Sequence, residues 1–257
     1  MRNLFLILLL SLWGGSACAQ EAVNGPGEGE AGRVLAITGP LSVRVQREEG
    51  EVEVRLGGLS TPVDARAQAW LEAQLNGKAV EIIADPANTD RYDRLIAQLV
   101  INPAAMDGGE VWVQEALIEA GLARFLAYDD TGEIAPALLQ AEARARGAGR
   151  GLWADAAHQI RDTNPDRLVQ DLGTLQLVEG RVMDVTRLDN GRTYINFGAD
   201  WRTDFTVRID ARDAGRFDAA DLEALESYRV RVRGVILEEN GPMIRLAYPG
   251  RLERLED

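Results

Sequence analysis

The chain has 257 residues, 46% of them hydrophobic, so it can bury a sizeable core and is not disordered as a whole. Its 41 Asp and Glu residues outnumber 28 Lys and Arg residues, and the formal charge of −13 argues against a protein that coats nucleic acid non-specifically. A single cysteine, Cys18, and a single histidine, His158, exclude a disulfide framework and metal sites built from Cys or His clusters.

The N-terminal segment MRNLFLILLLSLWGGSACAQ has a basic start, an apolar run and then small residues. This order predicts a signal peptide over residues 1–19 and export to the periplasm or the medium, because the run is too short to span a bilayer. Ala17 and Ala19 form an A-x-A cleavage site. The alternative is that GSAC is a lipoprotein box, in which case Cys18 is lipidated and the protein contacts the membrane as a lipid-anchored envelope protein.

The next part of the chain predicts a first folded unit. Residues 20–32 are rich in Gly and Glu and are expected to form a flexible leader, followed by a domain over residues 33–153. Alternating apolar residues predict strands, and apolar residues at helical spacing predict helices. We expect a strand over 33–45 that forms a hairpin with a strand at 52–56, further strands at 80–83 and 95–101, and helices at 64–76, 113–121 and 135–146.

Residues 154–173 are polar, lose clear periodicity and are predicted to be a linker, with His158 as an exposed residue within it. A second unit over residues 174–257 follows. It has predicted strands at 175–185, 193–197, 205–209, 228–237 and 243–248, and a helix at 218–225 with Asp218 as its N-cap. The order β-β-β-α-β-β is that of an OB-fold barrel.

Four segments of the first unit resemble the staphylococcal nuclease (thermonuclease) family. They are VRLGGLSTP at 54–62, DRYDRLIAQLV at 90–100, VQEALIEAGLARF at 113–125 and AEARARGAGRGLW at 141–153. The resemblance implies a five-stranded OB-type barrel with three helices. The fold class expected for the whole chain is therefore α+β, mainly β, with a nuclease-like barrel followed by a second OB-like barrel.

The family hydrolyses phosphodiester bonds of DNA and RNA with one calcium ion, using carboxylates for the metal and the general base and arginines for the phosphate. The resemblance assigns the two phosphate-binding positions to Arg55 and Arg94. However, Ser60 stands where the family has a metal-binding aspartate, Val63 replaces the general base, and Pro40 lies where a second metal aspartate is expected. A hydroxyl is a weak calcium ligand and valine cannot take a proton, so we expect a degenerate site with no metal and no cofactor.

Two functional hypotheses follow from the resemblance. The first is a binding or interaction module of the cell envelope, which binds nucleic acid or another polyanion weakly through Arg55 and Arg94, or an envelope partner that the sequence does not identify. The second is an active metal-dependent nuclease in which Asp64, next to Val63, helps to rebuild the metal site, and only this hypothesis requires calcium. A further alternative is that the protein has a purely structural role in the envelope. Arg55 and Arg94 would then be structural ion-pair residues.

Aromatic residues are the other candidates for ligand binding. Tyr128, in FLAYDD, lies near the segment with which the family stacks a nucleoside. In GRTYINFGADWRTDF, the residues Tyr194, Phe197 and Phe205 could stack bases on the face of the second barrel, as OB-folds do, together with Trp201. The alternative is that they fill the barrel, and residues 174–257 carry 13 Arg against 16 Asp and Glu, so this unit is not basic.

Overall fold

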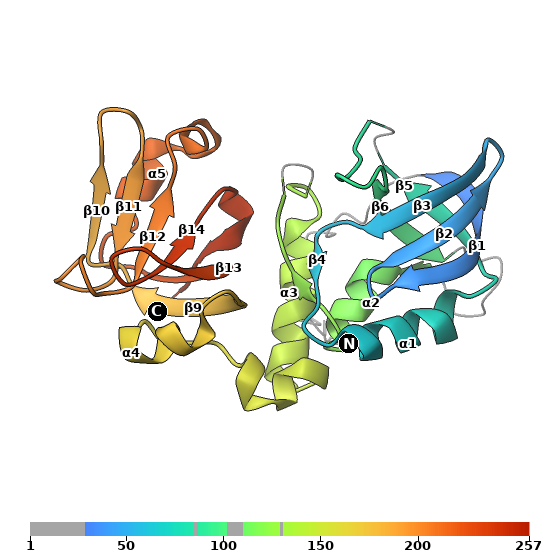
Figure 1. Ribbon diagram of the computed structural model, residues 1–257, viewed down its shortest axis with the longest axis horizontal. Coiled ribbons are helices and arrows are strands. Elements are labelled where there is room, and N and C mark those ends of the chain that lie inside the picture. The colour runs from blue at the N-terminus through green and yellow to red at the C-terminus, as the bar shows by residue number, and fades with distance from the viewer. Residues whose placement is uncertain (1–28, 85–86, 102–109, 129–130, 257) are drawn as a thin grey trace, which may run out of the picture.

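The computed structural model describes residues 29–84, 87–101, 110–128 and 131–256. The predicted signal peptide, Cys18 and most of the predicted leader lie outside these ranges. Figure 1 shows two β-barrels side by side, with helix α3 (Ala135–Gly147) between them. No helix within the described ranges has the length and apolar character needed to cross a membrane.

The first barrel is a closed, five-stranded OB-type barrel. Its strands are β1 (Glu30–Gly39), β2 (Ser42–Arg47), β3 (Gly50–Leu56), β5 (Ala79–Ile83) and β6 (Leu95–Ile101). The first three form an antiparallel meander, β5 pairs with both β1 and β6, and a parallel pairing of β3 with β6 closes the barrel. Alternate residues point inward, so that Val43, Val45 and Val54 are fully buried. β1 begins inside the segment that the sequence predicted as leader.

The three predicted helices of this unit are present. In α1 (Asp64–Leu75) the buried residues Ala67, Leu71 and Leu75 are four residues apart and form one apolar face against the barrel. Helix α2 (Val113–Glu119) follows the short strand β7 (Val111–Trp112), and two further short strands, β4 (Leu59–Ser60) and β8 (Arg124–Phe125), pair with each other.

The second sheet has the same strand connectivity as the first barrel. Its strands are β9 (Leu175–Arg181), β10 (Asp184–Arg187), β11 (Thr193–Asn196), β12 (Thr206–Ile209), β13 (Arg229–Glu238), β14 (Pro242–Arg245) and β15 (Leu252–Arg254). Here β12 and β14 form the parallel pair, and β13 pairs with β14 and β9. The strand predicted over 175–185 is divided, because β9 pairs with β13 whereas β10 pairs with β11. Asp218 caps helix α5 (Ala219–Glu223), as predicted.

The polar segment between the barrels is folded. It contains the 3₁₀ turns η2 (Gly151–Ala154), η3 (Ala156–His158) and η4 (Val169–Asp171) and the single helical turn α4 (Pro165–Leu168). Leu168 is buried in the core of the second barrel, and the backbone of Arg161 exchanges hydrogen bonds with Leu177 and Glu179 of β9. The segment predicted as a linker is therefore part of the packed structure.

A buried ion-pair cluster connects the two barrels. The Arg233 side chain of β13 is 0% exposed and lies 3.0 Å from the carboxylate of Glu142 in α3, which is 1% exposed. It also forms an ion pair with Glu253 and donates a hydrogen bond of 2.8 Å to the carbonyl of Phe125. Burial by itself lowers the pKa of Arg233, but the two carboxylates outweigh burial and raise the pKa above its ordinary value.

Two more arginines reach across the same boundary to main-chain carbonyls. Arg124 donates to the carbonyl oxygens of Leu175, at 3.0 Å, and His158, at 2.6 Å. Arg251 of the second unit donates to the carbonyl of Ala127, at 2.8 Å, in the first. Both barrels and the segment between them are thus linked by hydrogen bonds from buried or half-buried guanidinium groups.

His158 is half-buried and not exposed as the sequence predicted, because η3 folds against the barrel boundary. Burial, and next the positive charge of Arg124, lower the pKa of His158 from 6.5. Just below pH 6.5 the unfolded chain therefore binds more protons than the folded chain does. The stability that the folded state gains by keeping His158 neutral is present above that pH and is lost as the pH falls.

We expect the single histidine to titrate below pH 6.5 when its ring protons are followed by NMR, and to return to about 6.5 in denaturant. A native midpoint at or above the denatured one would contradict this expectation.

Candidate functional site

A pocket of about 280 Å³ lies at one end of the first barrel. Its wall is formed by the β1–β2 turn, the end of β3, β4 and the start of α1. The residues that line it are Pro40, Leu41, Ser42, Arg55, Ser60, Thr61, Asp64 and Arg94. The structure therefore brings together both predicted phosphate-binding arginines and two of the positions where a carboxylate is replaced. Val63, at the third such position, packs against the hydrophobic core.

The register of the parallel pair explains why the two arginines meet. Val54 of β3 lies opposite Leu95 of β6, and Arg55 lies opposite Ile96. Arg94 immediately precedes Leu95, so it lies one position before the Val54–Leu95 pair and close to Arg55 on the neighbouring strand. The closure of the barrel thus places two cations from distant parts of the sequence in one pocket.

Arg55 is a half-buried cation with weakly used donors. Its Nη1 and Nη2 atoms donate to the carbonyls of Leu41 and Leu59 over long distances of 3.3 and 3.4 Å. It has no ion-pair partner among the residues that the structure describes. Burial is the main cause that lowers the pKa of Arg55. The phenol of Tyr128 opposes it, the charge of Arg94 lowers the pKa further, and Asp90 and Asp64 have smaller raising effects. The guanidinium nevertheless keeps its charge near neutral pH.

Arg94, in contrast, has a carboxylate partner. Its Nε and Nη2 atoms donate to Oδ2 of Asp90 at 2.8 and 2.6 Å. The other carboxylate oxygen, Oδ1, accepts the backbone N–H groups of Tyr92 and Arg94. Burial acts to raise the pKa of Asp90, but the hydrogen bonds from Arg94 and the backbone outweigh it, and the pKa lies below its ordinary value. The ion-pair alternative therefore describes Arg94 and not Arg55.

The oxygen donors of the pocket do not fit a calcium ion. Calcium takes six to eight oxygen ligands, several of them carboxylates, whereas Asp64 is the one acidic residue among the described residues that line this pocket. The hydroxyl of Thr61 donates to the carbonyl of Leu122 and accepts the N–H of Val63, so it fastens the β4–α1 turn. Within the described ranges, no three His, Cys, Asp or Glu side chains come close enough to hold a metal.

Residues 51–155 match the family model of staphylococcal nuclease homologues. The chain contains a staphylococcal nuclease-like domain. The match runs from β3 to the residue after η2, and β1 and β2 complete the barrel on its N-terminal side. No curated protein matches the chain significantly.

A second pocket of the nuclease-like domain, of about 540 Å³, shares Arg55 with the first. Tyr128 lines it, and so does Tyr248 from the second barrel. The two rings lie edge to face with their centroids 5.6 Å apart, and the guanidinium of Arg251 lies 5.0 and 4.8 Å from them. Sequence reasoning proposed Tyr128 but missed Tyr248 and Arg251, because nothing in their local pattern links them to the other unit.

The structure corrects the prediction that Phe197 and Phe205 stack bases on the face of the second barrel. They are 8% and 1% exposed and pack against each other in the core of the second barrel, with ring centroids 5.1 Å apart. Neither presents a face to a ligand, so these two residues fill the barrel. Tyr194 and Trp201 of the same segment instead line a pocket on the outside.

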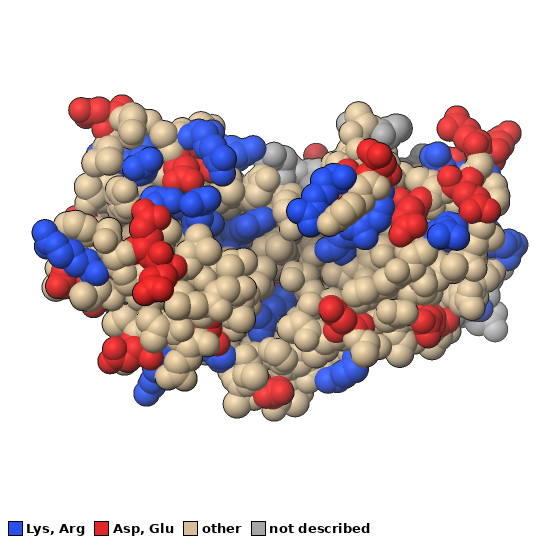
Figure 2. All heavy atoms as spheres, in the orientation of Figure 1, with Lys and Arg blue, Asp and Glu red and all other residues tan. Residues whose placement is uncertain are grey.

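Basic side chains are unevenly distributed on the surface. On the face shown in Figure 2 they lie on both barrels and gather mainly on the parts of each barrel next to the waist, whereas acidic side chains are spread over both barrels. A chain with a formal charge of −13 thus has local positive surface. Such a surface attracts anions at short range even when the net charge does not.

Proposed function

We propose that the nuclease-like domain binds an anionic group, such as the phosphate of a nucleic acid or another polyanion, and does not hydrolyse it with a metal. The observation that carries the proposal is the composition of the smaller pocket. It combines Arg55, a half-buried cation with no ion pair to any described residue, with Ser60 and Pro40 at positions where the family has metal ligands.

The chemistry of the pocket supports binding more than catalysis. A guanidinium forms charge-assisted hydrogen bonds with phosphate oxygens, and Arg55 has donors that are only weakly used. Hydrolysis also requires an activated water, supplied in this family by calcium and a general base. Ser60 and Val63 supply neither group.

The same proposal places the protein in the cell envelope. The N-terminal segment supports export, because cleavage after Ala19 and lipidation at Cys18 both send the chain across the membrane. The two outcomes differ only in whether the protein is released or held at a lipid surface.

A calcium-dependent nuclease assay on plasmid and single-stranded DNA tests the proposal. We expect no cleavage above the level in a chelator, and no calcium binding by calorimetry. The second candidate function, a nuclease with a rebuilt metal site, is favoured by one observation, namely that Asp64 lines the pocket beside both arginines. Calcium-dependent cleavage that disappears in both the Arg94→Ala and the Asp64→Asn variants would establish that function and overturn the proposal.

A further inference from the structure

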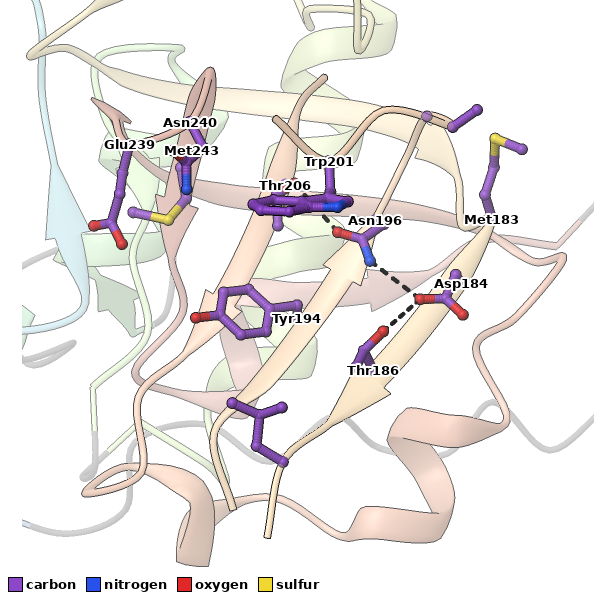
Figure 3. Close-up of a pocket in the computed structure, with 13 residues that line it drawn as sticks. Met183, Asp184, Thr186, Tyr194, Asn196, Trp201, Thr206, Glu239, Asn240 and Met243 are labelled. Atoms are coloured by element: carbon purple, nitrogen blue, oxygen red, sulfur yellow. Dashed lines mark hydrogen bonds between the residues drawn. The ribbon is translucent and has the colours of Figure 1, made fainter. Parts of the chain in front are cut away.

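A separate pocket of about 560 Å³ lies on the outer face of the second barrel. Residues alternate along β10, β11 and β12, so that Ile195 and Val207 point into the core while their neighbours point outward. Figure 3 shows Asp184, Tyr194 and Asn196 on this outer face, with Trp201 beside them. The volume is within the range of about 300–1,000 Å³ that is typical of small-ligand sites.

The pocket has an aromatic surface that is open to solvent. Trp201 is 51% exposed, and the guanidinium of Arg202 lies 4.3 Å from its ring centroid. Tyr194 is half-buried beside it, and Met183 is 59% exposed. A flat, exposed indole is a favourable surface for the apolar C–H face of a sugar ring, whose hydroxyl groups then point sideways toward polar groups.

A line of hydrogen-bonded polar side chains crosses the three strands beneath Trp201. The hydroxyl of Thr186 and the amide of Asn196 donate to the same oxygen of Asp184, at 2.6 and 3.1 Å. The hydroxyl of Thr206 donates to the Asn196 carbonyl, at 3.3 Å. These bonds hold the groups in place before a ligand arrives, and the Asp184 carboxylate, with about four acceptor positions, keeps capacity for hydroxyl donors.

The charges of the pocket disfavour nucleic acid. Its charged lining residues among those described are Asp184 and Glu239, and no Lys or Arg lines it. Glu239 forms an ion pair with Arg208, which neutralises it. OB-folds that bind nucleic acid pair their aromatic residues with a positive groove. Here, among the described residues, Arg202 stacks on Trp201 outside the pocket lining, and Arg208 is paired with Glu239. In the described lining, hydroxyl and amide groups outnumber Asp184, the one carboxylate there without an ion pair to a described residue, so a neutral ligand with many hydroxyls fits better than a cationic one.

We propose that this face binds an uncharged oligosaccharide, with one sugar ring stacked on Trp201 and its hydroxyls bonded to Asp184 and Asn196. OB-folds use the corresponding strands for oligosaccharides as well as for oligonucleotides. The site is independent of the anion pocket in the nuclease-like domain.

Titration of the full-length mature protein with cellotetraose and with the tetramer of N-acetylglucosamine tests the proposal, by calorimetry and tryptophan fluorescence. At least one sugar is expected to bind and to change the fluorescence of Trp201. The Trp201→Ala and Asn196→Ala variants should each weaken that binding about tenfold or more. The matched control is Tyr92→Ala, an aromatic residue that is 63% exposed in the other barrel and should not affect it.

Three results would overturn the proposal. The first is that neither sugar binds. The second is that the Trp201→Ala and Asn196→Ala variants bind the sugar as tightly as the unchanged protein does. The third is that an oligothymidine or trilysine probe changes the tryptophan fluorescence whereas neither sugar does. Circular dichroism verifies that each variant is folded, which we expect because Trp201 lies at the surface.

Discussion

Replacement of Arg233 by methionine is expected to lower the free energy of unfolding by about 3–5 kcal/mol. The carboxylate of Glu142 is 1% exposed, and without Arg233 its nearest remaining cation is Arg146, at 3.6 Å. The carbonyl of Phe125 would also lose its donor. A buried charge that loses its nearest cation and a buried carbonyl that loses a donor are both costly. Urea denaturation followed by tryptophan fluorescence measures the loss.

The matched control is Arg167→Met. Arg167 forms an ion pair with Asp162, but the two side chains are 71% and 55% exposed, so the change should be below about 1 kcal/mol. Combining Arg233→Met with Glu142→Met should recover much of the loss, because apolar side chains often replace a buried ion pair well. Equal losses in the Arg233 and Arg167 variants would show that the cluster does not hold the barrels together.

The second prediction separates the two arginines of the anion pocket. The Arg55→Gln variant should bind a labelled single-stranded oligonucleotide about tenfold to a hundredfold more weakly, since a hydrogen bond to a charged group contributes about 1.5–3 kcal/mol. The Asp90→Asn variant should bind the oligonucleotide more tightly. The substitution removes the carboxylate that pairs with Arg94, so the charge of Arg94 is available to the ligand, and it keeps an acceptor for the backbone N–H of Tyr92. Fluorescence anisotropy at one fixed, low salt concentration compares the variants.

Arg44→Gln is the control for loss of positive charge as such. Arg44 lies on β2 with its side chain 48% exposed and 3.9 Å from Glu53, outside the pocket, and its replacement should leave binding unchanged. If Asp90→Asn weakens binding as much as Arg55→Gln does, the Asp90–Arg94 pair shapes the pocket and does not compete with the ligand.

Local patterns predicted the fold well where a strand or helix has one buried face. The alternation around Val43 and Val45 and the spacing of Leu71 and Leu75 correspond to β2 and α1. The division between β9 and β10 was not predictable in this way. Val182 is fully buried between them, so the apolar pattern continues through the point where the chain changes partner strands. β15, which is three residues long, is too short to show any period.

The site was predictable in part, and for different reasons at each residue. The family resemblance placed Arg55 and Arg94 together, but the ion pair of Arg94 forms within a local turn in which Asp93 has a φ of 58°. No spacing rule predicts that turn. For the aromatic residues a signal was present, since Ile195 and Phe197 share one face of a strand and Tyr194 lies on the other. The alternation itself separates the buried ring from the exposed one.

The arginines that join the barrels have a consequence for how the sequence can vary. Arg124, Arg233 and Arg251 all donate to carbonyl oxygens of the main chain. Carbonyl acceptors are present whichever side chain the acceptor residue carries, so most substitutions at Ala127 or Leu175 that fit the space retain the bond. The donor side has no such tolerance, because a lysine lacks the planar fork that bonds two groups at once. At this boundary we therefore expect the acceptor residues to vary among related sequences, whereas the three arginines should not.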